Sequence, residues 1–125
     1  MRNRRQRVIL DRTGEVVLDD VHEATGPWGN FKGLMLRGSI PRGYGMVFRP
    51  AKGIHTQFMR FPIDLVFFDK TNQVTKVRDA MPPWRFDFTK AAGVIEMNPG
   101  AARAAGLRQG DTIRFEPATN GNDSR

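Results

Sequence analysis

One short segment, residues 55–64, holds side chains that could bind a ligand or a metal ion. Alternate residues of an extended strand face the same side, so His55 and Met59 would share one face of a strand here. An imidazole and a thioether together favour Cu(I), if Met35 and Met46 approach the same place. Methionine more often fills gaps in a core, and a lone histidine on a strand is more often a structural residue. The structural interpretation is therefore preferred, and no cofactor is predicted.

Two arginines and a carboxylate form a second candidate group. Arg37 and Arg60 would hold an anionic group of a ligand with their planar guanidinium forks, and Asp64 would orient it. Asp64 could equally pair with one of these arginines or accept hydrogen bonds from nearby backbone amides, as part of the fold. The sequence leaves both interpretations open.

Aromatic side chains beside Gly or Pro form a third group, which consists of Trp28, Tyr44, Trp84 and Phe86. Such residues display a binding platform when they are exposed, and they cover the end of a small barrel when they are packed. We expect Trp84 to cover a cleft whose floor is lined by His55 and Met59.

Catalysis is narrowly constrained by composition. The chain has no Cys and only two His, which excludes disulfides, thiolate nucleophiles, cysteine-ligated zinc and a three-histidine zinc site. A hydrolase or metal-dependent enzyme would have to use His55 with Asp64. Ser39, the one serine outside the C-terminal tail, lies in no nucleophile-elbow motif, so a catalytic triad is poorly supported. Whether the protein is an enzyme stays open.

The formal charge of +7 favours anionic partners. Four of the 20 Lys and Arg residues stand within the first seven positions, and the rest of the chain is nearly balanced against the 13 Asp and Glu residues. This basic arm could contact nucleic acid weakly, without sequence preference and in a salt-sensitive manner. No apolar run is long enough for a signal peptide or a membrane span, which predicts a cytoplasmic protein.

Short strands must position these residues. The length of 125 residues suits one domain, with residues 1–6 as a basic arm, 7–116 as the domain and 117–125 as a flexible tail. Apolar alternation and turn residues predict a mainly β, small barrel-like or sandwich domain. It would have about seven or eight short, largely antiparallel strands and one or two short helices. The expected extended runs are 7–10, 15–18, 44–48, 55–59, 64–69, 74–77, 93–97 and 112–116.

Turn residues mark the connections between these strands. Pro62 predicts a kink or bulge between the runs at 55–59 and 64–69, and the aromatic Phe61 before it raises the chance of a cis bond. Asn98 is expected to cap a short helix over 101–105, which Gly106 would end in the left-handed conformation. Residues 25–34 could form one or two helical turns or a packed loop.

Four motifs resemble a known family when they are taken together and in order: 33–37, 43–48, 55–69 and 93–111, the last with Glu96, Asn98-Pro99-Gly100 and Gly110-Asp111. They resemble the bacterial and archaeal domain-of-unknown-function family numbered 192, over about residues 25–116. The resemblance implies a small β-rich, barrel-like domain. It implies no established activity.

The leading hypothesis is a non-enzymatic binding module for an anionic small molecule or peptide. Three loops would bound its cleft, at 38–45, 55–64 and 81–86, because they hold nearly all the unusual polar and aromatic residues. The predicted ligand-binding residues are Arg37, His55, Met59, Arg60, Asp64 and Trp84. The alternatives are the enzyme described above and a nucleic-acid-associated accessory protein that binds through the basic arm.

Overall fold

The computed structural model describes residues 5–24, 40–55 and 60–118, with His55 described by its backbone alone. These residues form nine strands and one short helix, so the predicted mainly β class is confirmed. The strands are β1 (Gln6–Leu10), β2 (Glu15–Glu23), β3 (Tyr44–Phe48), β4 (Ile54–His55), β5 (Ile63–Phe68), β6 (Val74–Met81), β7 (Phe86–Asp87), β8 (Gly93–Met97) and β9 (Ile113–Pro117). The helix is α2 (Ala101–Ala104). No helix among the described residues is long and apolar enough to cross a membrane.

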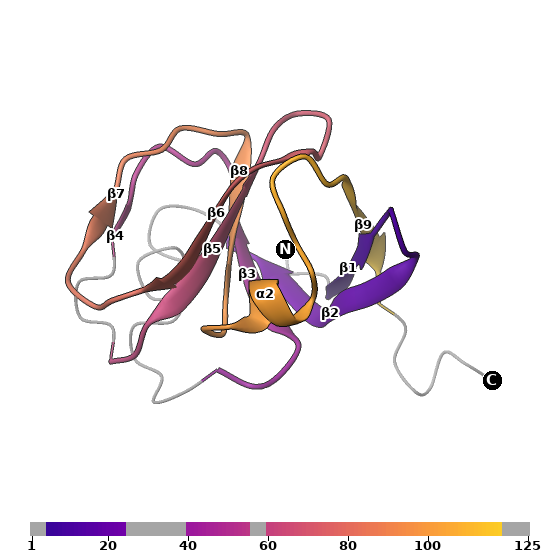
Figure 1. The fold of residues 1–125 in the computed structure, drawn as a ribbon, viewed down its shortest axis with the longest axis horizontal. Coiled ribbons are helices and arrows are strands. Elements are labelled where there is room, and N and C mark those ends of the chain that lie inside the picture. Colours follow the sequence, from indigo (N-terminus) through magenta and orange to yellow (C-terminus); the bar gives the residue numbers. More distant parts are fainter. Residues whose placement is uncertain (1–4, 25–39, 56–59, 119–125) are drawn as a thin grey trace.

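Seven strands form one curled sheet in the order β6-β5-β8-β3-β2-β1-β9, and β4 and β7 form a separate two-stranded ribbon (Figure 1). All neighbouring strands are antiparallel except β2 and β3. The two edges of the large sheet meet at one end, where the Val74 amide donates to the Asp111 carbonyl at 2.7 Å and the Gly110 amide donates to Val74 at 2.8 Å. The sheet therefore curls into a half-barrel, which confirms the predicted barrel-like class.

Two hydrophobic clusters share β5 and β8 between them. Phe68 and Ile95 belong to the cluster inside the curl of the sheet. Phe67 and Val94 belong to the second cluster, on the other face of the sheet, which also contains Ile54 of the ribbon. All six residues of β5 are buried, which explains the unbroken apolar run over its last four residues, 65–68. The second cluster places the ribbon against the half-barrel, at the left of Figure 1.

Several sequence predictions are confirmed by this arrangement. The hairpins β1–β2 and β5–β6 and the strands β3 and β8 form where alternation and turn residues predict them. Gly106 follows the helix with a φ of 73°. Its amide donates to Arg103 and the next amide, of Leu107, donates to Ala102, which is the Schellman arrangement that favours glycine at this position.

The predicted start of the helix is wrong. Gly100, not Asn98, occupies the N-cap position, with a φ of 88° and no side-chain cap. The Asn98 amide group instead donates to the Ile40 carbonyl at 2.8 Å, which fixes the approach to β3. The Ala102 amide, in the first turn of the helix, donates instead to the carboxylate of Asp64.

The kink predicted around Pro62 takes a different form. β5 and β6 have an irregular register between Ile63 and Leu65, and β4 pairs with β7 rather than with β5. The cis peptide bond among the described residues is Arg49–Pro50, not the bond before Pro62. The predicted turns over 25–34 lie outside the described residues, and the boundaries of the arm and the tail remain predictions.

Candidate functional site

Of the six predicted ligand-binding residues, the structure describes the backbone of His55 and the side chains of Arg60, Asp64 and Trp84. His55 ends β4 and its backbone pairs with Phe86 of β7, two residues after Trp84. Arg60 is exposed, and Asp64 is buried within β5. Arg37 and Met59 lie outside the described residues. Their place in the predicted cleft therefore stays a prediction.

Asp64 makes two hydrogen bonds that belong to the fold. One carboxylate oxygen accepts from the Ala80 amide at 2.7 Å and the other from the Ala102 amide at 3.0 Å. Ala102 is the second residue of α2, so Asp64 satisfies a helix amide that a local N-cap residue would ordinarily bind. Ala80 has a φ of 47°, and the carboxylate holds that irregular point of β6. These contacts match the structural interpretation of Asp64 that the sequence left open.

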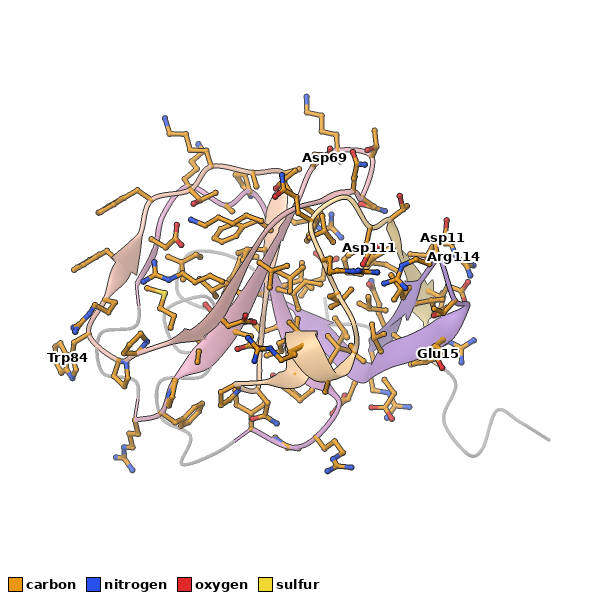
Figure 2. The ribbon with its side chains drawn as sticks, viewed as in Figure 1. Asp11, Glu15, Asp69, Trp84, Asp111 and Arg114 are labelled. Carbon is orange, nitrogen blue, oxygen red and sulfur yellow. The ribbon has the colours of Figure 1, made fainter. Side chains whose placement is uncertain are left out.

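A patch of exposed aromatic side chains lies on β7 and on the residues that flank it on both sides. Trp84, Phe86 and Phe88 expose 54 %, 50 % and 74 % of their surface, and we call these three residues the aromatic ribbon surface. Figure 2 shows Trp84 directed outward at the edge of the molecule that carries β7. The Phe86 and Phe88 rings are parallel, with centroids 5.7 Å apart. Only Val16, of the other large apolar side chains described, has comparable exposure.

A buried carboxylate anchors this surface to the half-barrel. Asp87 of β7 is 4 % exposed. Its carboxylate forms ion pairs with Lys76 at 3.2 Å and with Arg78 at 3.1 Å, both from β6. Burial alone would raise the pKa of Asp87. The hydroxyl and amide of Thr89 and the two cations outweigh burial and hold that pKa well below its usual range. Asp87 therefore points inward while the aromatic residues on either side of it point outward.

The rim of the aromatic ribbon surface is cationic. Lys52, Arg85 and Lys90 are exposed, whereas the carboxylate of Asp87 is buried against two cations. Residues 49–55 and 82–92 contain no other Asp or Glu. The surface thus combines apolar rings with positive charge and displays no exposed carboxylate in these two segments.

A second arrangement, absent from the predicted site, crosses the middle of the large sheet. His22 of β2 pairs with Met46 of β3, and Met46 pairs with Glu96 of β8. Directly paired residues project from the same face of a sheet. We call His22, Met46 and Glu96 the polar row. Met46 packs against the second hydrophobic cluster, so the row lies on that face of the sheet.

Glu96 is the least expected member of the polar row. It is 7 % exposed in a strand whose other residues are Gly or apolar, and burial raises the pKa of its carboxyl to about 8. No described residue donates a hydrogen bond to it in the contacts resolved. A charged residue inside the apolar run 94–97 was the signal in the sequence that could have singled it out.

The open grooves of the described residues lie away from the aromatic ribbon surface and the polar row, and two of them adjoin each other. One of about 980 Å³ runs between the start of β2 and α2, and its lining includes Val17, Arg42 and Ala101. Another of about 540 Å³ adjoins it and is lined by Arg5, Arg7 and Arg42 together with Asp19 and Asp20. Neither groove contains a predicted ligand-binding residue. Mixed charge along both grooves favours no single ligand.

Comparisons with known proteins assign the family. Residues 8–115 match the model of domain-of-unknown-function family 192, whose description is "Uncharacterized ACR". A UPF0127 protein of Thermococcus sibiricus is 31 % identical over 118 residues, which cover 87 % of this chain and 75 % of that protein.

Two solved structures share the fold. One, from Sinorhizobium meliloti 1021, is described as a candidate transcription regulator. It has a TM-score of 0.76 at 22 % identity, covering 91 % of this chain and 94 % of its own. The other, a protein of unknown function from Novosphingobium aromaticivorans, has a TM-score of 0.73 at 21 % identity, covering 90 % and 84 %. The fold and the family model agree with the motifs in the sequence: this chain belongs to domain-of-unknown-function family 192.

Proposed function

We propose that this protein is a non-enzymatic binding module that holds an extended, acidic peptide segment of a protein partner on the aromatic ribbon surface. The observation that carries the proposal is the exposure of Trp84, Phe86 and Phe88 beside the buried Asp87, whose ion pairs with β6 anchor the ribbon. Exposed apolar side chains that cluster, rather than scatter, mark interaction sites on soluble proteins.

The spacing of the aromatic residues suits an extended ligand. Phe86 and Phe88 are two residues apart, and the inward-facing Asp87 lies between them. An extended peptide repeats its side chains with the same period, so alternate apolar side chains of a partner can lie against successive rings. Aromatic residues supply large contact areas at low entropic cost, which makes them frequent hot spots.

Charge selects the kind of peptide. The exposed cations Lys52, Arg85 and Lys90 lie in the two segments that form the ribbon, and a partner with Asp or Glu between its apolar residues complements them. Complementary charge chiefly raises the association rate and rejects basic partners. Arg37 and Arg60 are further cations proposed for this role, and His55 and Met59 for apolar contact, as the sequence analysis expects.

Nucleic acid is the competing class of ligand. Aromatic rings and cations also bind single strands, by stacking and by phosphate contacts. The Phe86 and Phe88 rings already stack on each other, with centroids 5.7 Å apart, so a base could stack only on the outer faces of this pair. The peptide is therefore favoured.

The test is selection of peptides from a random library displayed on phage. Selection uses the full chain, with counter-selection on the triple variant Trp84→Ser, Phe86→Ser, Phe88→Ser. We expect peptides that alternate apolar and acidic residues, and an affinity at least tenfold weaker for the triple variant. Val16→Ser, which removes an exposed apolar side chain elsewhere, is the matched control and should bind as wild type.

Two results would overturn the proposal. One is enrichment of basic or charge-neutral peptides only, and the other is equal binding by the triple variant while its circular dichroism shows the native fold. Oligo-dT that binds more tightly than every selected peptide, and loses that binding in the triple variant, would assign the surface to nucleic acid instead.

A further inference from the structure

We propose that the open edge of β6 binds a short, extended, acidic segment of a protein partner as an added strand. This edge is separate from the aromatic ribbon surface and does not depend on it. β6 is the last strand on one side of the large sheet, so β5 is its strand neighbour on one side only. An unpaired edge is a template on which another chain can form a strand.

The backbone of β6 is closed at its start and open beyond it. The Val74 amide donates to the Asp111 carbonyl, and the Val74 carbonyl accepts from the Gly110 amide, so the two edges of the half-barrel meet there. From 75 to 79, the backbone bonds to no described residue outside β5. The next amide, of Ala80, donates to the Asp64 carboxylate. The open edge therefore consists of residues 75–79, which limits the partner to a short strand.

A groove lies beside this open edge. It has a volume of about 580 Å³ and is lined by Val77 and Asp79 of β6, by Arg103 of α2, by residues 106–109 and by Arg12. Residues 106–109 lead directly into the bond between Gly110 and β6, so the groove opens where the two segments separate. Ligand sites typically have volumes of about 300–1,000 Å³. A segment that pairs with β6 would direct alternate side chains into this groove.

The groove has an apolar floor. Val77 packs against the cluster inside the curl, and Leu107, 5 % exposed, belongs to the same cluster. Directly paired residues share a face of the sheet, so an apolar partner residue opposite Val77 would pack on both side chains. Lys76 and Arg78, on either side of Val77, project from the other face, where both pair with Asp87. Alternate residues of the partner would therefore meet an apolar floor on one face and cations on the other.

Charge around the groove favours an acidic partner. Arg12 is held by Asp111 through contacts of 3.1 and 3.2 Å, and Arg103 lies 3.5 Å from Asp79. Arg103 is 82 % exposed, so its ion pair contributes little and the guanidinium is free to turn toward a ligand. Arg108 is exposed and forms no ion pair with the residues that the structure describes. Acidic side chains of a partner would complement Arg103 and Arg108.

A second copy of this chain fits the edge poorly. An antiparallel pair of β6 strands centred on Val77 would place Lys76 opposite Arg78 twice. Like charges directly opposite each other destabilise a sheet. The favoured occupant is therefore an acidic segment of another protein.

The test uses the ¹⁵N-labelled full chain and the N-acetylated, C-amidated peptide Glu-Val-Glu-Val-Glu. We expect saturable shifts of the backbone amide resonances of residues 75–79 and 106–109, and slower hydrogen exchange at alternate amides of 75–79. The same shifts should appear in the triple variant Trp84→Ser, Phe86→Ser, Phe88→Ser, which lacks the aromatic ribbon surface. The same peptide N-methylated at every internal residue keeps its side chains but loses its internal N–H donors, so it should bind at least tenfold more weakly.

The contribution of charge is tested with variants of exposed arginines. The double variant Arg103→Glu, Arg108→Glu should bind the peptide at least tenfold more weakly than wild type. Arg42→Glu is the matched control, because Arg42 is exposed but lines the other two grooves. It should bind as wild type.

Four results would overturn the proposal. The peptide could shift no amide of 75–79, or shift these amides only while the aromatic ribbon surface is intact. The N-methylated peptide could bind as tightly as the unmodified one, or the double arginine variant, with native circular dichroism, could bind as tightly as wild type. Self-association of the wild-type chain that protects the amides of 75–79 without any peptide would assign the edge to a second copy instead.

Discussion

Glu96→Gln should make the protein more stable at neutral pH and leave its stability unchanged in acid. The buried carboxyl has a pKa of about 8 in the folded state, against 4.5 for an ordinary glutamate. A raised carboxyl pKa means that the folded state holds the proton more tightly. Its contribution to stability is therefore fully present below pH 4.5 and is lost as the pH rises towards 8.

The size of this effect follows from the two pKa values. One pKa unit corresponds to about 1.4 kcal/mol. Between pH 4 and pH 7 the wild type should lose about 3 kcal/mol through Glu96 alone, and the Gln variant should not. Glutamine has nearly the same shape as the protonated acid, so the variant should equal the wild type near pH 4.

Urea unfolding of both proteins from pH 4 to pH 8 measures the effect. The difference in unfolding free energy between the two proteins cancels the contributions of the other carboxylates. Glu15→Gln, at an exposed position of β2, controls for the loss of one charge. A difference that is the same at pH 4 and pH 7 would refute the burial of an ionisable carboxyl at this position.

Three further substitutions test other parts of the structure. Asp87→Asn should destabilise the protein by about 1–3 kcal/mol at pH 7, measured by urea unfolding. Because the pKa of Asp87 is lowered, that difference should shrink as the pH falls below about 4; a constant difference would contradict the anchor. Asp64→Asn should cost about 1–3 kcal/mol and speed hydrogen exchange at the Ala102 amide; unchanged exchange would contradict the cap. Gly93→Ala should cost about 1–3 kcal/mol in a thermal melt, because the new methyl group would overlap the buried Phe68 ring; a melt equal to wild type would contradict that packing.

Local patterns carried most of the fold prediction. The alternation in β3 and β8 and the glycine at 106 each act within a few residues, so the sequence is sufficient to place them. The Asn98 cap was predicted from equally local reasoning, and it is wrong because a distant side chain, Asp64, takes its place. A cap supplied across 38 residues leaves no local signature.

The candidate sites depend on pairing between distant segments, which local patterns do not reveal. His55 and Phe86 meet through strands of two residues each, too short for any alternation to show. His22 and Met46 meet through the parallel pair β2–β3, and nothing near either residue indicates that register. Residue types alone indicated Trp84 and Asp64, but only the fold distinguishes an exposed ring from a carboxylate that bonds backbone amides.

Fluorescence of Trp84 tests the proposed binding surface most directly. The chain has two tryptophans, and Trp28→Phe leaves Trp84 as the only one. Adding a selected acidic peptide should shift the Trp84 emission to shorter wavelength, saturably, as the ring leaves water, and the shift should need less peptide at low salt. A peptide that binds the chain while the Trp84 emission stays unchanged would contradict the assignment of the aromatic ribbon surface as the binding site.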